Sequence, residues 1–345
     1  MSPNETTAVL LPPTRLSFRA VAGLPLIQRI ALSALRAGFT RVVALADGDP
    51  SALRAILDRD QRTRGIDIVP ADSAAVTGPR VVRIPPDCVL DECGRVRFRV
   101  TEDTIGQAEE QLLADVRAAT AATDGPLARI DRALSIRLSR RLARTRIRPS
   151  HLTLGGTVVG LLGAWSFAHG SYAAGVLGAA LFWIAIIIDG CDGEVARLTF
   201  RESAFGAKLD VVTDNVVHAA VFLGIGLGQH RADPGRHPLL LVGILLAGFS
   251  AALVTTWFCL VRDAAARTRA SSSDSPARAR LLRGFETVMN RDFAYLLIIL
   301  ALIDRLSWFL WGAAFGTWAY AVGLPWIAGS RPRTECQTAN RLEGV

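Results

Sequence analysis

The sequence is poor in lysine and in cysteine. It has one lysine, Lys208, against 38 arginines, and its five cysteines form no C-x-x-C pair and leave one over. These cysteines exclude a zinc ribbon and a disulfide framework, and they fit a reducing compartment. No basic segment followed by an apolar stretch opens the chain, so we expect no signal peptide. Half of the 345 residues are hydrophobic, which excludes a disordered chain, and the length favours two domains.

Charge is divided unevenly along the chain. Residues 1–126 carry 15 basic and 16 acidic side chains, whereas residues 127–345 carry 24 basic and 15 acidic ones. In the second part, long apolar runs alternate with arginine clusters, which is typical of a polytopic membrane protein. The arginines flank the apolar runs and are not interleaved with aromatic residues, so we expect no nucleic-acid partner.

Residues 1–122 are predicted to form a small cytoplasmic α/β domain. Short apolar runs typical of buried strands alternate with helical segments, which favours a largely parallel sheet. The expected strands are 7–11, 41–45, 66–69 and 80–84, and the expected helices are 24–37, 51–59 and 102–121.

Residues 23–43 resemble the early helix and second strand of sugar-phosphate nucleotidyltransferases. In that family a G-x-G-x-R loop wraps a triphosphate, whereas the corresponding residues 11–16 here contain two prolines and no glycine. Because proline lacks a donor N–H and stiffens the loop, we expect a degenerate, noncatalytic domain. Two alternatives stay open, namely an unrelated small α/β domain and an active cytidylyltransferase with an unusual loop.

Residues 123–148 are predicted to form a basic amphipathic juxtamembrane helix. The segment contains eight arginines, and its apolar residues at 127, 130, 134, 138 and 142 recur every three or four positions. Such a helix would lie in the membrane interface with its arginines toward anionic lipid headgroups.

Residues 149–330 are predicted to be a membrane domain, followed by a tail at 331–345. Six apolar spans are expected, at 152–168, 172–188, 209–229, 238–261, 293–303 and 306–328. Most basic residues fall on one side, in the segment before the first span, the loops 189–208 and 262–291, and the tail. By the positive-inside rule both termini face the cytoplasm. We therefore expect an integral protein of a bacterial or archaeal cytoplasmic membrane.

Two pairs of aspartates lie between the second and third spans. Asp189 and Asp192 are three residues apart, and Asp210 and Asp214 are four apart, so each pair lies on one helix face. Because the connection is short, the two helices are expected to be antiparallel neighbours whose pairs face each other. Four converging carboxylates become tolerable when they bind divalent metal, and all-oxygen ligation suits Mg²⁺ or Mn²⁺.

The residues around these aspartates suit a phosphate ligand. Gly193 and Ala196 leave room for a nucleotide close to the backbone, and Arg197 offers a planar fork for a phosphate. A carboxylate-bound metal ion beside such an arginine is typical of sites that catalyse phosphoryl transfer. The whole run fits the pattern D-x-x-D-G-x-x-A-R-x8-G-x-x-x-D-x-x-x-D, the signature of the CDP-alcohol phosphotransferase family, which the chain resembles over about residues 124–330.

This resemblance implies a reaction and a role for each fixed position. The family transfers a substituted phosphate from a CDP-linked alcohol to a second alcohol and releases CMP. One or two Mg²⁺ ions would be held by Asp189, Asp192 and Asp210. Asp214 would deprotonate the acceptor hydroxyl and could also touch a second ion. The CDP pocket would be shaped by Gly193, Ala196, Arg197 and Gly206.

Three further residues are candidate substrate contacts. His218 follows Asp214 by one helical turn and could orient that aspartate, or it could be a packed intramembrane histidine. Lys208 could contact a phosphate or could extend to the interface. Thr153 could reach the nucleotide.

The sequence leaves the substrates open. The donor could be CDP-diacylglycerol or a CDP-polyol such as CDP-inositol, and the arginine-rich face favours an anionic acceptor. The family resemblance implies a homodimer in contact with membrane lipids. A non-enzymatic scaffold or transporter that reuses the fold is the competing hypothesis, and it would be favoured by loss of a signature aspartate, which is not observed.

Overall fold

The computed structural model describes residues 6–72, 81–121, 128–145, 147–267 and 293–329. The predicted tail 331–345 and most of the predicted loop 262–291 lie outside these residues. The chain divides into two compact units. The first comprises Met1–Ala122, Ile130–Thr153 and Ile188–Leu209, and the second comprises Thr123–Arg129, Leu154–Ile187 and Asp210–Val345.

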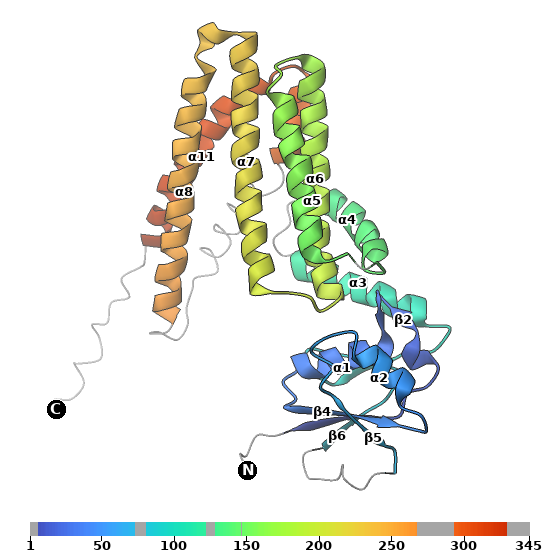
Figure 1. Ribbon diagram of the computed structural model, residues 1–345. Coiled ribbons are helices and arrows are strands. Elements are labelled where there is room, and N and C mark those ends of the chain that lie inside the picture. The colour runs from blue at the N-terminus through green and yellow to red at the C-terminus, as the bar shows by residue number, and fades with distance from the viewer. Residues whose placement is uncertain (1–5, 73–80, 122–127, 146, 268–292, 330–345) are drawn as a thin grey trace, which may run out of the picture. The chain divides into compact units, whose positions relative to one another are not determined.

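The first unit contains a sheet of four parallel strands in the order β5-β4-β1-β6. These strands are β1 (Thr7–Leu10), β4 (Arg41–Ala46), β5 (Asp67–Pro70) and β6 (Val81–Ile84). All four lie where apolar runs predicted them. Helices α1 (Leu26–Arg36) and α2 (Ser51–Leu57) connect β1 to β4 and β4 to β5, and both lie on one face of the sheet (Figure 1). Two successive right-handed crossovers in one direction require this placement.

Two short hairpins in the first unit were missed by the sequence analysis. They are β2 (Ala20–Val21) with β3 (Leu24–Pro25), and β7 (Cys88–Leu90) with β8 (Val96–Arg99). The helix predicted from residue 24 begins only at Leu26, because residues 24 and 25 pair with β2 instead. These strands have two to four residues, which is too short for a clear alternating pattern.

The basic segment folds as α4 (Ala128–Leu142), which follows α3 (Ile105–Ala121). Its predicted apolar stripe is exposed at Ile130 and Leu134, at 52% and 37%. The opposite, polar face is buried, including Ser135 and Ser139. The stripe is therefore free to meet a membrane, while the polar face packs within the protein.

The expectation that the α4 arginines all point to lipid headgroups is wrong. Arg132 is buried and forms an ion pair with Glu194 of α6. Arg140 of α4 and Arg144, two residues beyond the end of α4, both pair with Glu109 of α3. Periodicity placed these arginines on helix faces but could not show that carboxylates of other helices meet them.

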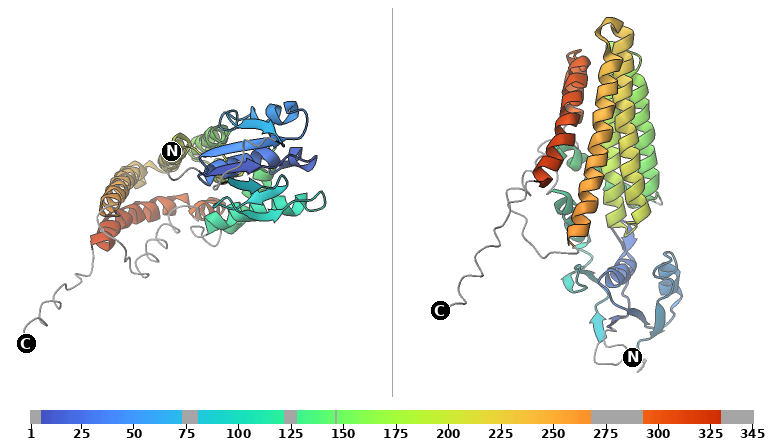
Figure 2. Two further views of the ribbon diagram at one scale, coloured as in Figure 1. Left: turned by 90° about the horizontal axis from the view of Figure 1, so that it is seen from below. Right: turned by 90° about the vertical axis from the view of Figure 1, so that its left-hand side faces the viewer.

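Six helices build the described part of the second unit, and three of them, α5, α6 and α7, also have an end in the first unit. In chain order they are α5 (Pro149–Phe167), α6 (Tyr172–Leu198), α7 (Ala204–Ala232), α8 (Pro238–Arg267), α10 (Phe293–Leu302) and α11 (Leu306–Gly329). Helices α5, α6 and α7 run side by side (Figures 1 and 2). They begin and end close to the six predicted spans, except around the signature.

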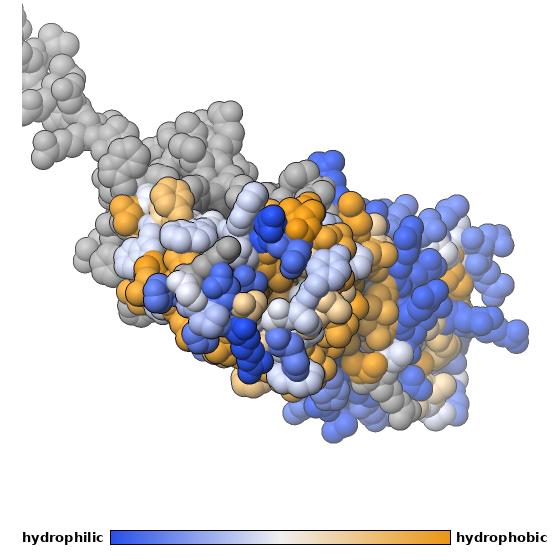
Figure 3. Space-filling model, turned by 90° about the horizontal axis from the view of Figure 1, so that it is seen from above, coloured by the Kyte–Doolittle hydropathy of each residue, from blue (hydrophilic) through white to orange (hydrophobic). Residues whose placement is uncertain are grey.

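Three of the described helices are long and apolar enough to cross a membrane, namely α6, α7 and the Pro238–Thr255 part of α8. Helix α10 is strongly apolar but has ten residues. The second unit also leaves large apolar side chains exposed, among them Trp165, Trp308, Trp311 and Phe315. Figure 3 looks onto the ends of the helices, where hydrophilic residues (blue) gather between hydrophobic ones (orange). Apolar helix sides with polar ends are expected of a membrane protein.

Glycines allow α5 and α7 to approach each other closely. A Cβ atom added to Gly224 would lie 2.2 Å from the backbone oxygen of Ala164 in α5. One added to Gly228 would lie 2.1 Å from the backbone oxygen of Phe167. The α5–α7 contact is therefore backbone to backbone, as small residues permit in membrane helices.

The predicted extent of the loop 189–208 is wrong. Helix α6 continues through the first half of the signature to Leu198, and α7 begins at Ala204. The connection is residues 199–203 alone. The polar signature residues interrupt the apolar run that defined the span, but they do not interrupt the helix, because alanine, arginine, leucine and glutamate favour helix.

Candidate functional site

Three signature aspartates come together at the facing ends of α6 and α7. Asp189 of α6 and Asp210 and Asp214 of α7 each offer a carboxylate oxygen, and these oxygens lie within 4.8 Å of one another. All three side chains are half-buried. Three converging carboxylates with oxygen ligands at this separation suit a hard divalent cation such as Mg²⁺ or Mn²⁺.

Asp192 does not belong to this group of three. It is buried, at 7% exposed, and its Oδ2 accepts a hydrogen bond from the hydroxyl of Thr153 at the start of α5. The same hydroxyl lies 3.3 Å from the backbone oxygen of Pro149. Thr153, considered above as a nucleotide contact, therefore holds a signature aspartate in place.

The other signature residues, Gly193, Ala196, Arg197 and Gly206, differ in their surroundings. A Cβ atom added to Gly193 would meet no heavy atom within 4 Å, so open space adjoins the backbone there. Ala196 is buried and Arg197 is half-buried. The N–H of Gly206 donates to Ser203 Oγ at 3.0 Å, an N-cap that starts α7.

The two remaining candidates differ in their surroundings. Lys208 is exposed on the first turns of α7. The ring of His218 packs against the rings of Phe182 and Phe293, with centroid separations of 5.9 and 5.2 Å. These aromatic contacts favour the packed intramembrane histidine over a substrate contact.

A buried ion pair beside the signature was missed by the sequence analysis. Arg132 Nη1 lies 3.0 Å from Glu194 Oε1, and their side chains are 7% and 0% exposed. Ser135 Oγ donates to the same oxygen at 2.7 Å. The i, i+3 spacing of Arg132 and Ser135 on α4 was the available signal, but nothing in the sequence pointed to Glu194 as their partner.

The sequence pattern of the CDP-alcohol phosphatidyltransferase family matches residues 146–324, more than half of the chain. Among curated relatives, the bifunctional IPC transferase and DIPP synthase of Rubrobacter xylanophilus is 36% identical over 137 residues, which is 39% of this chain and 30% of that protein. The archaetidylinositol phosphate synthase of Pyrococcus horikoshii is 33% identical over 93 residues, 27% of this chain and 47% of that protein. The matches thus span less than half the length of these relatives.

Similar solved structures include the phosphatidylinositol phosphate synthase of Mycobacterium tuberculosis, once with CDP-DAG bound and once with manganese and citrate. Each is 22% identical with a TM-score of 0.41 and covers 59% of this chain, and the matches cover 98% and 93% of those chains. The family match contains all eight fixed signature positions, from Asp189 to Asp214. The resemblance seen in the sequence is confirmed, and the chain belongs to the CDP-alcohol phosphatidyltransferase family.

Proposed function

We propose that this protein transfers a substituted phosphate from a CDP-linked alcohol to the hydroxyl of a second alcohol, with release of CMP. Family membership supports the reaction class. The observation that carries the proposal is the meeting of Asp189, Asp210 and Asp214 within 4.8 Å. A scaffold without activity would have no need of converging carboxylates, which repel one another in the absence of a cation.

The same three aspartates would hold the divalent cation, and Asp192 would support them from its place against Thr153. A cation bound there would offset the charge of the donor's diphosphate and make CMP a better leaving group. We assign the pocket for CDP to Gly193, Ala196, Arg197 and Gly206, where open space adjoins Gly193.

Asp214 is the proposed general base. It would accept the proton of the acceptor hydroxyl as that oxygen attacks the phosphorus and the bond to CMP breaks. Arg197 would bind a phosphate oxygen through its planar guanidinium group. Both assignments rest on the position of each residue in the signature.

The site is proposed to face the cytoplasm, together with both termini, in a membrane domain of six spans. The arginine clusters next to the apolar helices support this orientation. The exposed apolar stripe of α4 supports contact with the membrane interface. A homodimer is proposed from the family resemblance.

The α/β domain is proposed to be noncatalytic. Nucleotides bind parallel sheets beyond the carboxyl ends of the strands, where the strand order reverses. Here that place lies between β1 and β6, and the chain's own residues meet there. Thr14 Oγ1 lies 2.9 and 2.8 Å from the two carboxylate oxygens of Asp87, and Ser17 Oγ lies 2.8 Å from one of them. This network fixes the proline-containing loop in place of a phosphate-binding one.

The test is CMP release by the full-length protein in detergent with Mg²⁺. CDP-diacylglycerol and CDP-inositol would each be offered with inositol phosphate, glycerol phosphate and inositol as acceptors. We expect CMP from one donor–acceptor pair and none from Asp214→Asn, which keeps the side-chain shape but removes the charge. Asp304→Asn is the matched control, because it makes the same change at an exposed aspartate outside the carboxylate group. CMP release that survives Asp214→Asn unchanged, or no release from any pair, would overturn the proposal.

A further inference from the structure

The carboxyl end of α6 packs against the α/β domain within the first unit. The Leu198 side chain is 2% exposed and belongs to an apolar cluster with Ala22, Val116 and Ile136. Ala22 comes from the β2–β3 hairpin, Val116 from α3 and Ile136 from α4. Leu198, the last residue of α6, therefore packs against three separate parts of the first unit.

A buried arginine of the α/β domain binds the same residue through its backbone. Arg29 of α1 is 3% exposed, and its Nη2 donates to the backbone oxygen of Leu198 at 2.8 Å. The guanidinium group also donates to the backbone oxygens of Val21 and Ala22. Burial lowers the pKa of Arg29 to about 10, against the opposing effect of Glu109, so the group is charged at neutral pH. A buried cation with carbonyl partners is a costly arrangement unless those hydrogen bonds are kept.

The turn after α6 has a strained backbone. The N–H groups of Phe200 and Arg201 donate to the carbonyls of Arg197 and Ala196, at 3.3 and 2.8 Å. This is the Schellman pattern, whose left-handed position glycine usually occupies, yet Phe200 holds it with φ of 57°. A bulky residue in this conformation persists only where its surroundings enforce it.

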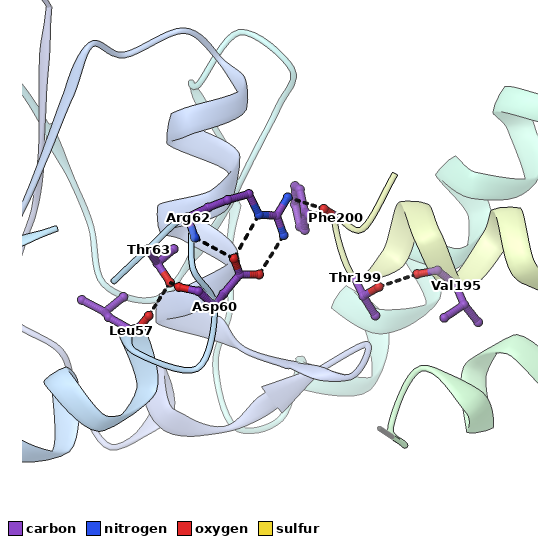
Figure 4. A network of polar contacts seen from close by, with 7 residues as sticks. All are labelled: Leu57, Asp60, Arg62, Thr63, Val195, Thr199 and Phe200. Carbon is purple, nitrogen blue, oxygen red and sulfur yellow. Dashed lines mark hydrogen bonds and ion pairs between the residues drawn. The ribbon is translucent and has the colours of Figure 1, made fainter. Parts of the chain in front are cut away.

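Three arginines of the α/β domain supply these surroundings. Arg29 and Arg36 lie over the Phe200 ring, 5.5 and 5.0 Å from its centroid. Arg62 donates to the Phe200 backbone oxygen and is itself held by Asp60, through contacts of 3.0 and 2.8 Å (Figure 4). Arg36 also forms an ion pair with Glu202. We call Arg29, Arg36 and Arg62 the arginine anchor.

The anchored turn is part of the signature. Its acceptor carbonyls belong to Ala196 and Arg197, two fixed signature positions, and residues 199–203 are the whole connection between α6 and α7. The connection therefore sets how the aspartates of one helix meet those of the next. A shift of this turn would change the spacing of the carboxylates on which cation binding depends.

We propose that the α/β domain is a positioning element for the signature, and that the arginine anchor on Leu198 and Phe200 holds the α6–α7 turn in the conformation that the carboxylate site requires. The expected effect on CMP release rests on the proposed function. The expected effect on the conformation of the α6–α7 turn is independent of the proposed function.

The test uses the full-length protein with Arg29→Met, Arg29→Lys and Phe200→Gly. Phe200→Gly keeps the left-handed conformation accessible and removes the ring, so it serves if Arg29→Met does not fold. Arg41→Gln is the control, because Arg41 is an exposed arginine of the same domain that pairs with Asp67. Two quantities are measured, namely deuterium exchange of the 199–203 amides without metal, and CMP release against Mg²⁺ concentration.

We expect exchange of the 199–203 amides to rise about tenfold in Arg29→Met, which corresponds to the loss of one hydrogen bond to a charged group. Exchange should also rise in Phe200→Gly, because the ring contacts with Arg29 and Arg36 are lost and glycine leaves the backbone freer. The Mg²⁺ concentration for half-maximal rate should rise several-fold with partial recovery in Arg29→Lys, and Arg41→Gln should match the wild type. A smaller folded fraction would lower the maximal rate but would not move the Mg²⁺ dependence.

Each measurement can overturn the inference separately from the proposed function. Unchanged exchange would show that the anchor does not hold the turn. Faster exchange with wild-type Mg²⁺ dependence would show that the turn does not position the site. No CMP release from the wild-type protein would refute the proposed function, while the exchange data would still decide whether the anchor holds the turn.

Discussion

Arg132→Met is expected to destabilise the first unit strongly, because it leaves the buried carboxylate of Glu194 without the guanidinium group that pairs with it. The two groups are 3.0 Å apart, and Glu194 is fully buried. Of the two side chains that bind Glu194 in the described residues, Ser135 would then be left, with a contact of 2.7 Å. Glu194 Oε2 has no hydrogen-bond partner in the described part of the chain.

The magnitude follows from distance and burial. At 3.0 Å and an effective dielectric constant of about 20, the attraction is about 5–6 kcal/mol. Desolvation of the two ions offsets most of this, so the intact pair contributes little net stability. Removing one partner forfeits the attraction and keeps the desolvation of the other, for a loss of about 3–5 kcal/mol. The double variant Arg132→Met/Glu194→Met removes both terms and should lie within about 1–2 kcal/mol of the wild type.

The assay is the free energy of unfolding in mixed detergent micelles, measured for both single variants and the double variant. Arg41→Met is the matched control, since Arg41 and Asp67 lie 2.9 Å apart but are 65% and 57% exposed. Exposed pairs contribute at most about 1 kcal/mol. The reasoning is refuted if Arg132→Met costs no more than Arg41→Met, or if the double variant loses the sum of the two single losses.

Other predictions concern packing, reactivity and pH. Gly224→Ala should lower the thermal unfolding midpoint by forcing α5 and α7 apart. Gly155→Ala is the control, because a Cβ atom added there meets nothing within 4 Å. Equal midpoints for the two variants would contradict the packing argument. Burial raises the pKa of the Cys88 thiol to about 12, whereas Cys93 is exposed. A maleimide at about pH 8 should therefore modify Cys93 and spare Cys88, as measured by peptide mapping. Labelling of Cys88 in the native protein would contradict this prediction. The hydrogen bond from Arg62 holds the pKa of Asp60 below its ordinary value, against a smaller effect of burial. The stabilisation by Asp60 is therefore present above the unfolded-state pKa of about 4 and is lost as pH falls through the folded-state pKa. Asp60→Asn should lower the free energy of unfolding at about pH 7 and have little effect at about pH 2. An equal effect at both pH values would argue against a lowered pKa of Asp60.

Local patterns in the sequence were sufficient for the four parallel strands and for the signature, but not for the two short hairpins. The four parallel strands were predicted because each is a short apolar run between turn residues. The signature was recognisable because its eight fixed residues lie within 26 consecutive positions, 189–214. The α6–α7 connection was predicted too long, because hydropathy detects the end of an apolar run and not the end of a helix.

The sequence by itself determined which carboxylates are available for a cation and which helices carry them. The tertiary structure decided what holds them. Thr153 and Asp192 are 39 residues apart, Arg132 and Glu194 are 62 apart, and Arg29 and Leu198 are 169 apart. In a chain with 38 arginines, composition cannot tell which few turn inward. That choice depends on which carbonyl or carboxylate each arginine meets once the helices have packed, because a buried guanidinium group is stable only where those partners are in place.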